Sequence, residues 1–190
     1  MMRIDYSLSI RIWHWLNAVA VTGLLGTFFL RKTFLSWRDN SALIVEKLSS
    51  LGVDVTAEQA KIVAKAIRAP MWEWHIIFGV MLALLLLFRI WIFWQEVGFG
   101  YDSDEQSQHA RLIHGGYRIF YLILIFMAVS GLILNWSELL GLSKEMTHSI
   151  KEIHGYVAWA VAVFVPLHII GIFIADNDDQ RGIVSRMISG

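Results

Sequence analysis

Two histidines in the last apolar stretch of the chain are the residues whose type and spacing point most directly to chemistry. His154 and His168 lie 14 residues apart, and no charged residue stands between Ile153 and Asp176. In a helix this spacing places the two imidazoles about 21 Å apart along the axis and only about 40° apart around it. An apolar run of this length predicts a membrane span, and ionisable groups inside a span are generally functional. One helix would therefore present two imidazoles on one face, one near each side of a bilayer, which is the geometry that two stacked cofactors need.

The composition indicates an integral membrane protein. Of the 190 residues, 56% are hydrophobic and 17% are charged, and the mean hydropathy is +0.55, whereas soluble domains are less apolar and more charged. A formal net charge of zero without a basic block argues against nucleic-acid binding. The lack of cysteine excludes covalent c-type haem, iron–sulfur clusters and thiolate zinc sites.

Four apolar segments must position these histidines. They cover about residues 10–30, 72–94, 114–136 and 150–175, and each is long enough to cross about 30 Å of hydrocarbon as a helix. We therefore predict an all-α fold, a bundle of four transmembrane helices that forms a single domain over residues 1–190. Tryptophans at the predicted span ends suit an aromatic belt at the membrane interfaces; these are Trp13, Trp15, Trp72, Trp74, Trp91, Trp94 and Trp136.

The connections between the spans differ in character. Residues 31–71 form a long polar loop in which Thr56 and Gln59 make a capping-box pair before an amphipathic pattern. The pattern predicts a short helix over the end of the bundle, and the alternative is a docking surface for a partner subunit. The second connection, around GFGYDSDEQSQ, is glycine-rich and acidic and predicts a solvated loop.

Antiparallel connectivity pairs four of the histidines in two layers. The start of the first span and the end of the fourth lie on one side of the membrane, so His14 should share a level with His168. The starts of the second and fourth spans lie on the other side, so His75 should share a level with His154. A single histidine near a span end is more often an interfacial hydrogen-bonding residue than a ligand, but four that meet this constraint favour ligation. Two imidazoles are too few for structural zinc and suit a six-coordinate haem iron, which predicts electron transfer.

Further polar residues fall near the predicted layer of His14 and His168. Arg89 lies 14 residues after His75, hence near this layer, where it would pair with a haem propionate or snorkel to the interface. Pro166 should remove the hydrogen bond to the Ala162 carbonyl and weaken the fourth helix there. Four residues at this level are candidates for a quinone pocket, with lipid-headgroup contact as the alternative; these are Arg11, Asn17, His114 and Arg118. His114 is also a competing third ligand.

The chain resembles the bacterial cytochrome b561 group, and most closely the b-type cytochrome subunit of membrane-bound nickel–iron hydrogenases. The resemblance is carried by the opening SIRIWHWLN, by Gly79 and Arg89 at four and fourteen residues after His75, by IHGYVAWAVAVFVPLH and by the ending DNDDQRGIVSRMISG. It implies two b haems, ligated by the two histidine pairs above, cytoplasmic termini, and quinone chemistry near one haem. The loop over residues 31–71 and the compact length depart from the hydrogenase subunit and bear on the partner more than on the haems.

We therefore expect a multi-pass, di-haem cytochrome of the bacterial inner membrane, embedded in lipid. It would transfer electrons between a periplasmic redox partner, a hydrogenase or another dehydrogenase, and the quinone pool of a respiratory chain. The alternative is a stand-alone cytochrome b561 oxidoreductase that couples a small oxidant or reductant such as superoxide to quinone. A histidine-lined transporter or a haem-free membrane anchor is the third hypothesis, and a homodimer stays open. The lysines and arginines do not orient the chain, so cytoplasmic termini rest on the resemblance.

Overall fold

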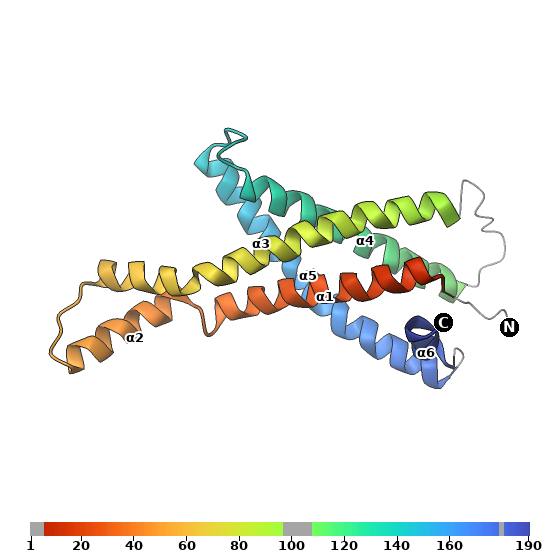
Figure 1. Cartoon of the computed structure of the whole chain (residues 1–190), viewed down its shortest axis with the longest axis horizontal. Coiled ribbons are helices and arrows are strands. Elements are labelled where there is room, and N and C mark those ends of the chain that lie inside the picture. The colour runs from red at the N-terminus through yellow and green to blue at the C-terminus, as the bar shows by residue number, and fades with distance from the viewer. Residues whose placement is uncertain (1–5, 97–107, 179–180) are drawn as a thin grey trace. The chain divides into compact units, whose positions relative to one another are not determined.

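The computed structural model describes residues 6–96, 108–178 and 181–190, with the backbone alone for residue 96 and residues 108–114. The regular elements of the described part are all helices (Figure 1). They are α1 (Leu8–Lys32), α2 (Trp37–Ser50), α3 (Ala57–Glu96), α4 (Gln108–Asn135), α5 (Lys144–Asn177) and α6 (Ile183–Ile188). Four of them, α1, α3, α4 and α5, are long and apolar enough to cross a membrane. The predicted all-α membrane fold is confirmed, whereas most of the predicted acidic loop lies outside the described residues.

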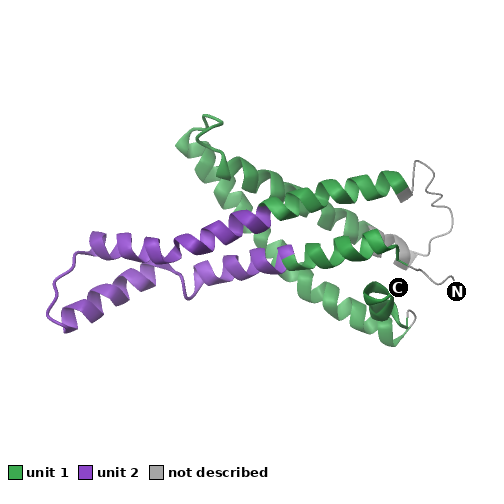
Figure 2. Ribbon diagram, viewed as in Figure 1, with its two compact units in different colours: residues 1–19, 80–190 green, residues 20–79 purple. Residues whose placement is uncertain are grey.

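The helices form two compact units (Figure 2). Unit 1 comprises residues 1–19 and 80–190, and unit 2 comprises residues 20–79. All four membrane-spanning helices contribute to unit 1, because it contains one end of α1, one end of α3, and the whole of α4 and α5. Unit 2 contains the remainder of α1 and α3 together with α2. Many large apolar side chains on the spans are exposed, as expected for helix faces that lipid covers.

A buried tryptophan joins α1 to α3 within unit 1. The Trp13 side chain is buried, and its indole Nε1 donates a hydrogen bond of 2.7 Å to the Leu85 carbonyl. The Tyr121 ring of α4 lies against it, with 5.9 Å between the ring centroids. The prediction that Trp13 belongs to the interfacial belt is therefore wrong, because its N–H finds a buried acceptor and the ring is free to pack in the core.

The close approach of α1 and α3 in unit 2 depends on a glycine. A Cβ at position 23 would lie 2.5 Å from the Phe78 ring, well inside van der Waals contact, so only Gly23 admits the ring at this distance. The indole of Trp37 on α2 lies beneath the ammonium groups of Lys61 and Lys65 of α3, at 5.8 and 5.9 Å from the ring centre. These contacts hold the three helices of unit 2 together.

The predicted loop over residues 31–71 is largely helical. Its capping box is confirmed, since the Thr56 amide donates to Gln59 Oε1 at 2.9 Å and the Gln59 amide donates to Thr56 Oγ1 at 3.3 Å. The prediction of a short helix here is wrong: the helix continues through Pro70 as α3 to the end of the second span. Proline removes one ladder hydrogen bond while its neighbours keep theirs, and a long apolar helix tolerates this loss.

Candidate functional site

The structure brings His14 of α1 and His168 of α5 together in unit 1. Their ring centroids lie 6.2 Å apart, and the ring planes are inclined by 55°. A metal ion held between two imidazoles would separate the ring centres by about 6 Å, because each metal–nitrogen bond is about 2 Å and the centre lies about 1 Å beyond the nitrogen. The pair therefore has the spacing at which one metal ion fits between two axial imidazoles.

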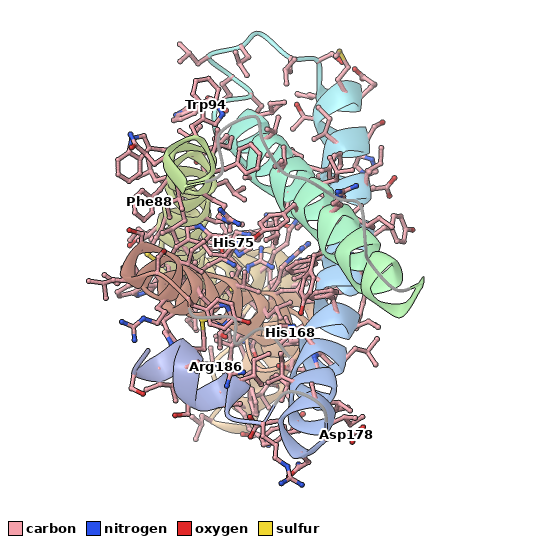
Figure 3. All side chains as sticks on the ribbon, turned by 90° about the vertical axis from the view of Figure 1, so that its right-hand side faces the viewer. His75, Phe88, Trp94, His168, Asp178 and Arg186 are labelled. Atoms are coloured by element: carbon pink, nitrogen blue, oxygen red, sulfur yellow. The ribbon has the colours of Figure 1, made fainter. Side chains whose placement is uncertain are left out.

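Aromatic side chains surround His168, which Figure 3 labels. The Phe164 ring, one turn earlier on α5, is nearly parallel to the imidazole, with 5.8 Å between centroids. The hydroxyl of Tyr117 on α4 lies 3.5 Å from His168 Nδ1, at the limit for a hydrogen bond. This contact occupies the Nδ1 side of the ring and leaves Nε2 available to a ligand.

His75 has a buried hydroxyl partner in unit 2. Thr27 of α1 is 7% exposed, and its Oγ1 lies 2.7 Å from His75 Nδ1. The same oxygen is 2.8 Å from the Leu24 carbonyl, which can only accept. Because a hydroxyl has one proton and that proton serves Leu24, Oγ1 accepts from the imidazole. His75 then carries its proton on Nδ1, which makes Nε2 the nitrogen that could bind a metal.

His154 has the same arrangement in unit 1. Ser130 of α4 is 4% exposed, and its Oγ lies 2.7 Å from His154 Nδ1 and 2.6 Å from the Phe126 carbonyl. By the same reasoning Ser130 accepts a hydrogen bond from His154 and leaves Nε2 unprotonated. Gly131 follows Ser130, and a Cβ on it would lie 3.4 Å from His154 Cε1. Thr27 and Ser130 are the buried polar residues of the described part of the chain, and each meets a histidine predicted to bind iron.

Arg89 of α3 contacts Trp13, the residue that precedes His14 on α1. Arg89 is half-buried, and the carbon of its guanidinium lies 5.6 Å from the centre of the Trp13 ring. Its Nε donates to the Tyr121 hydroxyl at 3.3 Å. The predicted role of Arg89 beside the haem of His14 and His168 stays a prediction, which its contact with Trp13 is compatible with.

The four quinone candidates differ in their surroundings. Arg11 Nε and Asn17 Oδ1 are buried and have no hydrogen-bond partner among the described residues, while Arg11 Nη1 donates to the Ile188 carbonyl of α6 at 3.4 Å. Arg118 is exposed. The side chain of His114 lies outside the described part of α4.

His75 and His154 belong to different units, so their pairing stays a prediction.

The family model described as prokaryotic cytochrome b561 matches residues 5–190. The chain belongs to this family. This cytochrome b561 is therefore a multi-pass bacterial membrane protein of the b-type cytochrome class, which binds b-type haem and takes part in electron transfer. A search of curated proteins and a search of solved structures gave no match.

Sequence reasoning missed the hydroxyl partners of the histidines in this cytochrome b561. A signal for Thr27 was present: it follows His14 by 13 residues, about 20 Å along a helix, which is the level predicted for His75. Ser130 is likewise a polar residue inside an apolar span. A hydropathy profile shows only that each span contains a polar residue. Which imidazole the hydroxyl contacts depends on how one helix is rotated against its neighbour, which the profile does not contain.

Proposed function

We propose that this cytochrome b561 binds two haems b, one between His14 and His168 and the other between His75 and His154. It would transfer electrons between a periplasmic redox protein and quinone across the bacterial inner membrane, with both termini in the cytoplasm. The observation that carries the proposal is the 6.2 Å separation of the His14 and His168 rings. When bound, haem b supplies reversible one-electron chemistry at a six-coordinate iron.

The hydroxyl partners support the choice of the other two histidines. Thr27 and Ser130 each hold an imidazole by Nδ1 at 2.7 Å, so that Nε2 can face a cofactor in a fixed orientation. A histidine that only anchored a span at the interface would have no need of a buried partner. The hydrogen bond also makes the imidazole a stronger donor to iron.

The 14-residue spacing on α5 supports a path across the membrane. His154 and His168 lie about 21 Å apart along this helix, so they reach most of the thickness of the hydrocarbon layer. With cytoplasmic termini, α1 runs outward, and α2 with the start of α3 follows on the periplasmic side. We propose this segment as the surface for the periplasmic donor or acceptor.

Quinone would bind near His14. Arg11 Nε and Asn17 Oδ1, within one turn of His14 on α1, are buried and have no hydrogen-bond partner in the described part of the chain. Together they offer a donor and an acceptor to a quinone and its reduced form. Arg118 and His114 are included as quinone candidates only because the sequence predicts them at the level of His14. Arg89, held over Trp13, would compensate a propionate of the haem on this side.

Haem stoichiometry and ligand substitution test the proposal. The purified protein should contain two b haems per chain, both extractable by acidic acetone because no cysteine tethers them. His75→Ala and His154→Ala should abolish the same spectral component, and His14→Ala should abolish the other. His148→Ala is the matched control, because His148 is exposed and lies 3.8 Å from the Glu152 carboxylate. A protein without haem, or a His148 variant that loses one, would contradict the assignment.

A quinone analogue tests the direction of the path. It should shift the spectrum or the potential of the haem that depends on His14, and leave the other unchanged. An analogue that acts only on the haem that depends on His75 would place quinone on the opposite side of the membrane.

A further inference from the structure

Two guanidinium groups converge on one indole beside His75 in unit 2. The central carbon of Arg31, at the end of α1, lies 5.3 Å from the centre of the Trp72 ring, and that of Arg68 on α3 lies 5.9 Å from it. The Trp72 ring in turn meets the imidazole of His75 edge-on, with 5.5 Å between centroids and an interplanar angle of 78°. The four side chains thus form an unbroken series of contacts from the two guanidinium groups through Trp72 to His75.

The positive charge of this cluster is uncompensated within the described part of the chain. No ion pair there joins Arg31 or Arg68 to a carboxylate, and the buried Nε of Arg68 has no hydrogen-bond partner. Both arginines are half-buried, and both guanidinium groups lie within 6 Å of the same indole ring centre. Indole faces attract each cation but do not cancel the repulsion between them. A buried guanidinium N–H without an acceptor is costly, so the cluster has the character of an anion site.

The register of the helices relates this anion site to His75. Thr27, which contacts His75, lies four residues before Arg31 on α1, about one helical turn. On α3 the stripe His75, Trp72 and Arg68 steps back by three and four residues, so that these side chains share one face. Both guanidinium groups therefore lie on one side of the level of His75, the side on which α1 ends. That end also carries Lys32, as expected near a membrane surface.

We propose that Arg31 and Arg68 form a carboxylate-binding site for the propionates of the haem on His75, with Trp72 holding both guanidinium groups in place. The proposal rests on the proposed function, because it assumes that His75 binds haem. Propionates extend from the edge of the macrocycle on short arms, and guanidinium groups bind carboxylates in a bidentate manner. An arginine also contacts a tryptophan in unit 1, where Arg89 lies 5.6 Å from the ring centre of Trp13, the residue that precedes His14. A lipid phosphate has related chemistry, and the test separates it from a propionate.

Reconstitution of the full-length protein with haem b and with haem b dimethyl ester tests this site. The ester keeps the iron and the macrocycle but has no carboxylate. Arg31→Gln and Arg68→Gln should each weaken binding of haem b at the component that depends on His75 by roughly tenfold or more, and should leave binding of the ester unchanged. The midpoint potential of that component should fall, since a cation beside the iron is lost, and Arg68→Lys should restore part of the shift.

Arg38→Gln is the matched control. Arg38 also lies over an indole in unit 2, 5.1 Å from the ring centre of Trp37, which belongs to α2 and not to the stack on His75. This variant should leave both haem affinities and both potentials unchanged. If a glutamine variant fails to fold, the wild-type protein alone still tests the proposal. It should bind haem b more tightly than the ester at the component that depends on His75.

Three results would overturn the proposal. If the wild type binds haem b and its ester equally tightly at this component, or if the arginine variants keep the wild-type preference for haem b over the ester, the two arginines bind no propionate. If the variants lose only affinity for vesicles containing anionic phospholipid, relative to purely zwitterionic vesicles, the anion is a lipid phosphate. In both cases two haems and their dependence on the four histidines would leave the proposed function intact. A wild-type protein without any haem that depends on His75 would overturn the proposed function and this site together.

Discussion

Removing the hydroxyl of Ser130 should loosen the haem proposed to bind His154 and raise its midpoint potential. In the structure Ser130 Oγ lies 2.7 Å from His154 Nδ1 and donates its own hydrogen bond to the Phe126 carbonyl at 2.6 Å. Ser130→Ala removes the oxygen that accepts from the imidazole N–H, at a serine that is only 4% exposed. The imidazole then becomes a weaker donor to iron, and the oxidised state, which depends more on that donation, loses more stability than the reduced state.

The size of the effect follows from the hydrogen bond that is lost. A buried bond of this kind contributes about 0.5–1.5 kcal/mol net, and loss of a partner that orients a metal-bound histidine typically weakens metal binding by roughly 10- to 100-fold. If the oxidised state bears about 0.5–1.4 kcal/mol more of the loss than the reduced state, the potential rises by about 20–60 mV, since 59 mV corresponds to a factor of ten for one electron.

Redox titration of the purified protein, monitored in the visible bands, measures this shift separately for each of the two proposed haems. Ser149→Ala is the control, because the Ser149 hydroxyl donates to the Glu145 carbonyl on an exposed face of α5. Ser130→Thr keeps a hydroxyl and should restore the potential. The reasoning would be refuted if Ser130→Ala left both potentials unchanged, or if it shifted the haem that persists in His154→Ala.

Three further outcomes test the packing and the cofactor. Gly23→Ala places a Cβ 2.5 Å from the Phe78 ring and should destabilise the protein by about 1–3 kcal/mol through overpacking, as measured by thermal unfolding. Gly116 is exposed and has no atom near an added Cβ, so Gly116→Ala should leave the stability unchanged. Equal melting temperatures of the two variants would contradict the close packing at Gly23. Trp15→Phe removes the 3.1 Å hydrogen bond to the Met187 carbonyl and should accelerate amide exchange in α6 up to about tenfold, whereas unchanged exchange would show that α6 docks by other contacts. Protein produced under haem depletion should unfold at a lower temperature than the haem-loaded protein, because a ligand that binds only the folded state stabilises it; identical transitions would argue against bound haem.

Much of the architecture follows from local features of the sequence. Span length and hydropathy predict the four membrane helices, because a helix in lipid must satisfy its own backbone and present apolar side chains. The capping box at Thr56 and Gln59 predicts a helix start, since both partners lie within one turn. The spacing of His154 and His168 predicts their shared face, because helical geometry alone relates residues on one element. Antiparallel connectivity then predicts the level shared by His14 and His168, whose rings lie 6.2 Å apart.

Contacts between elements depend on the rotation and separation of helices, which no periodicity within one helix encodes. Only the folded chain brings Thr27 to His75 and Ser130 to His154, buries Trp13 against the Leu85 carbonyl, and gathers two arginines over one indole. The continuity of α3 through Pro70 likewise depends on packing along a whole helix, against which a single lost hydrogen bond is small. The sequence therefore predicts the residue types and their levels along the helices, whereas side-chain packing between helices determines which partner orients each imidazole.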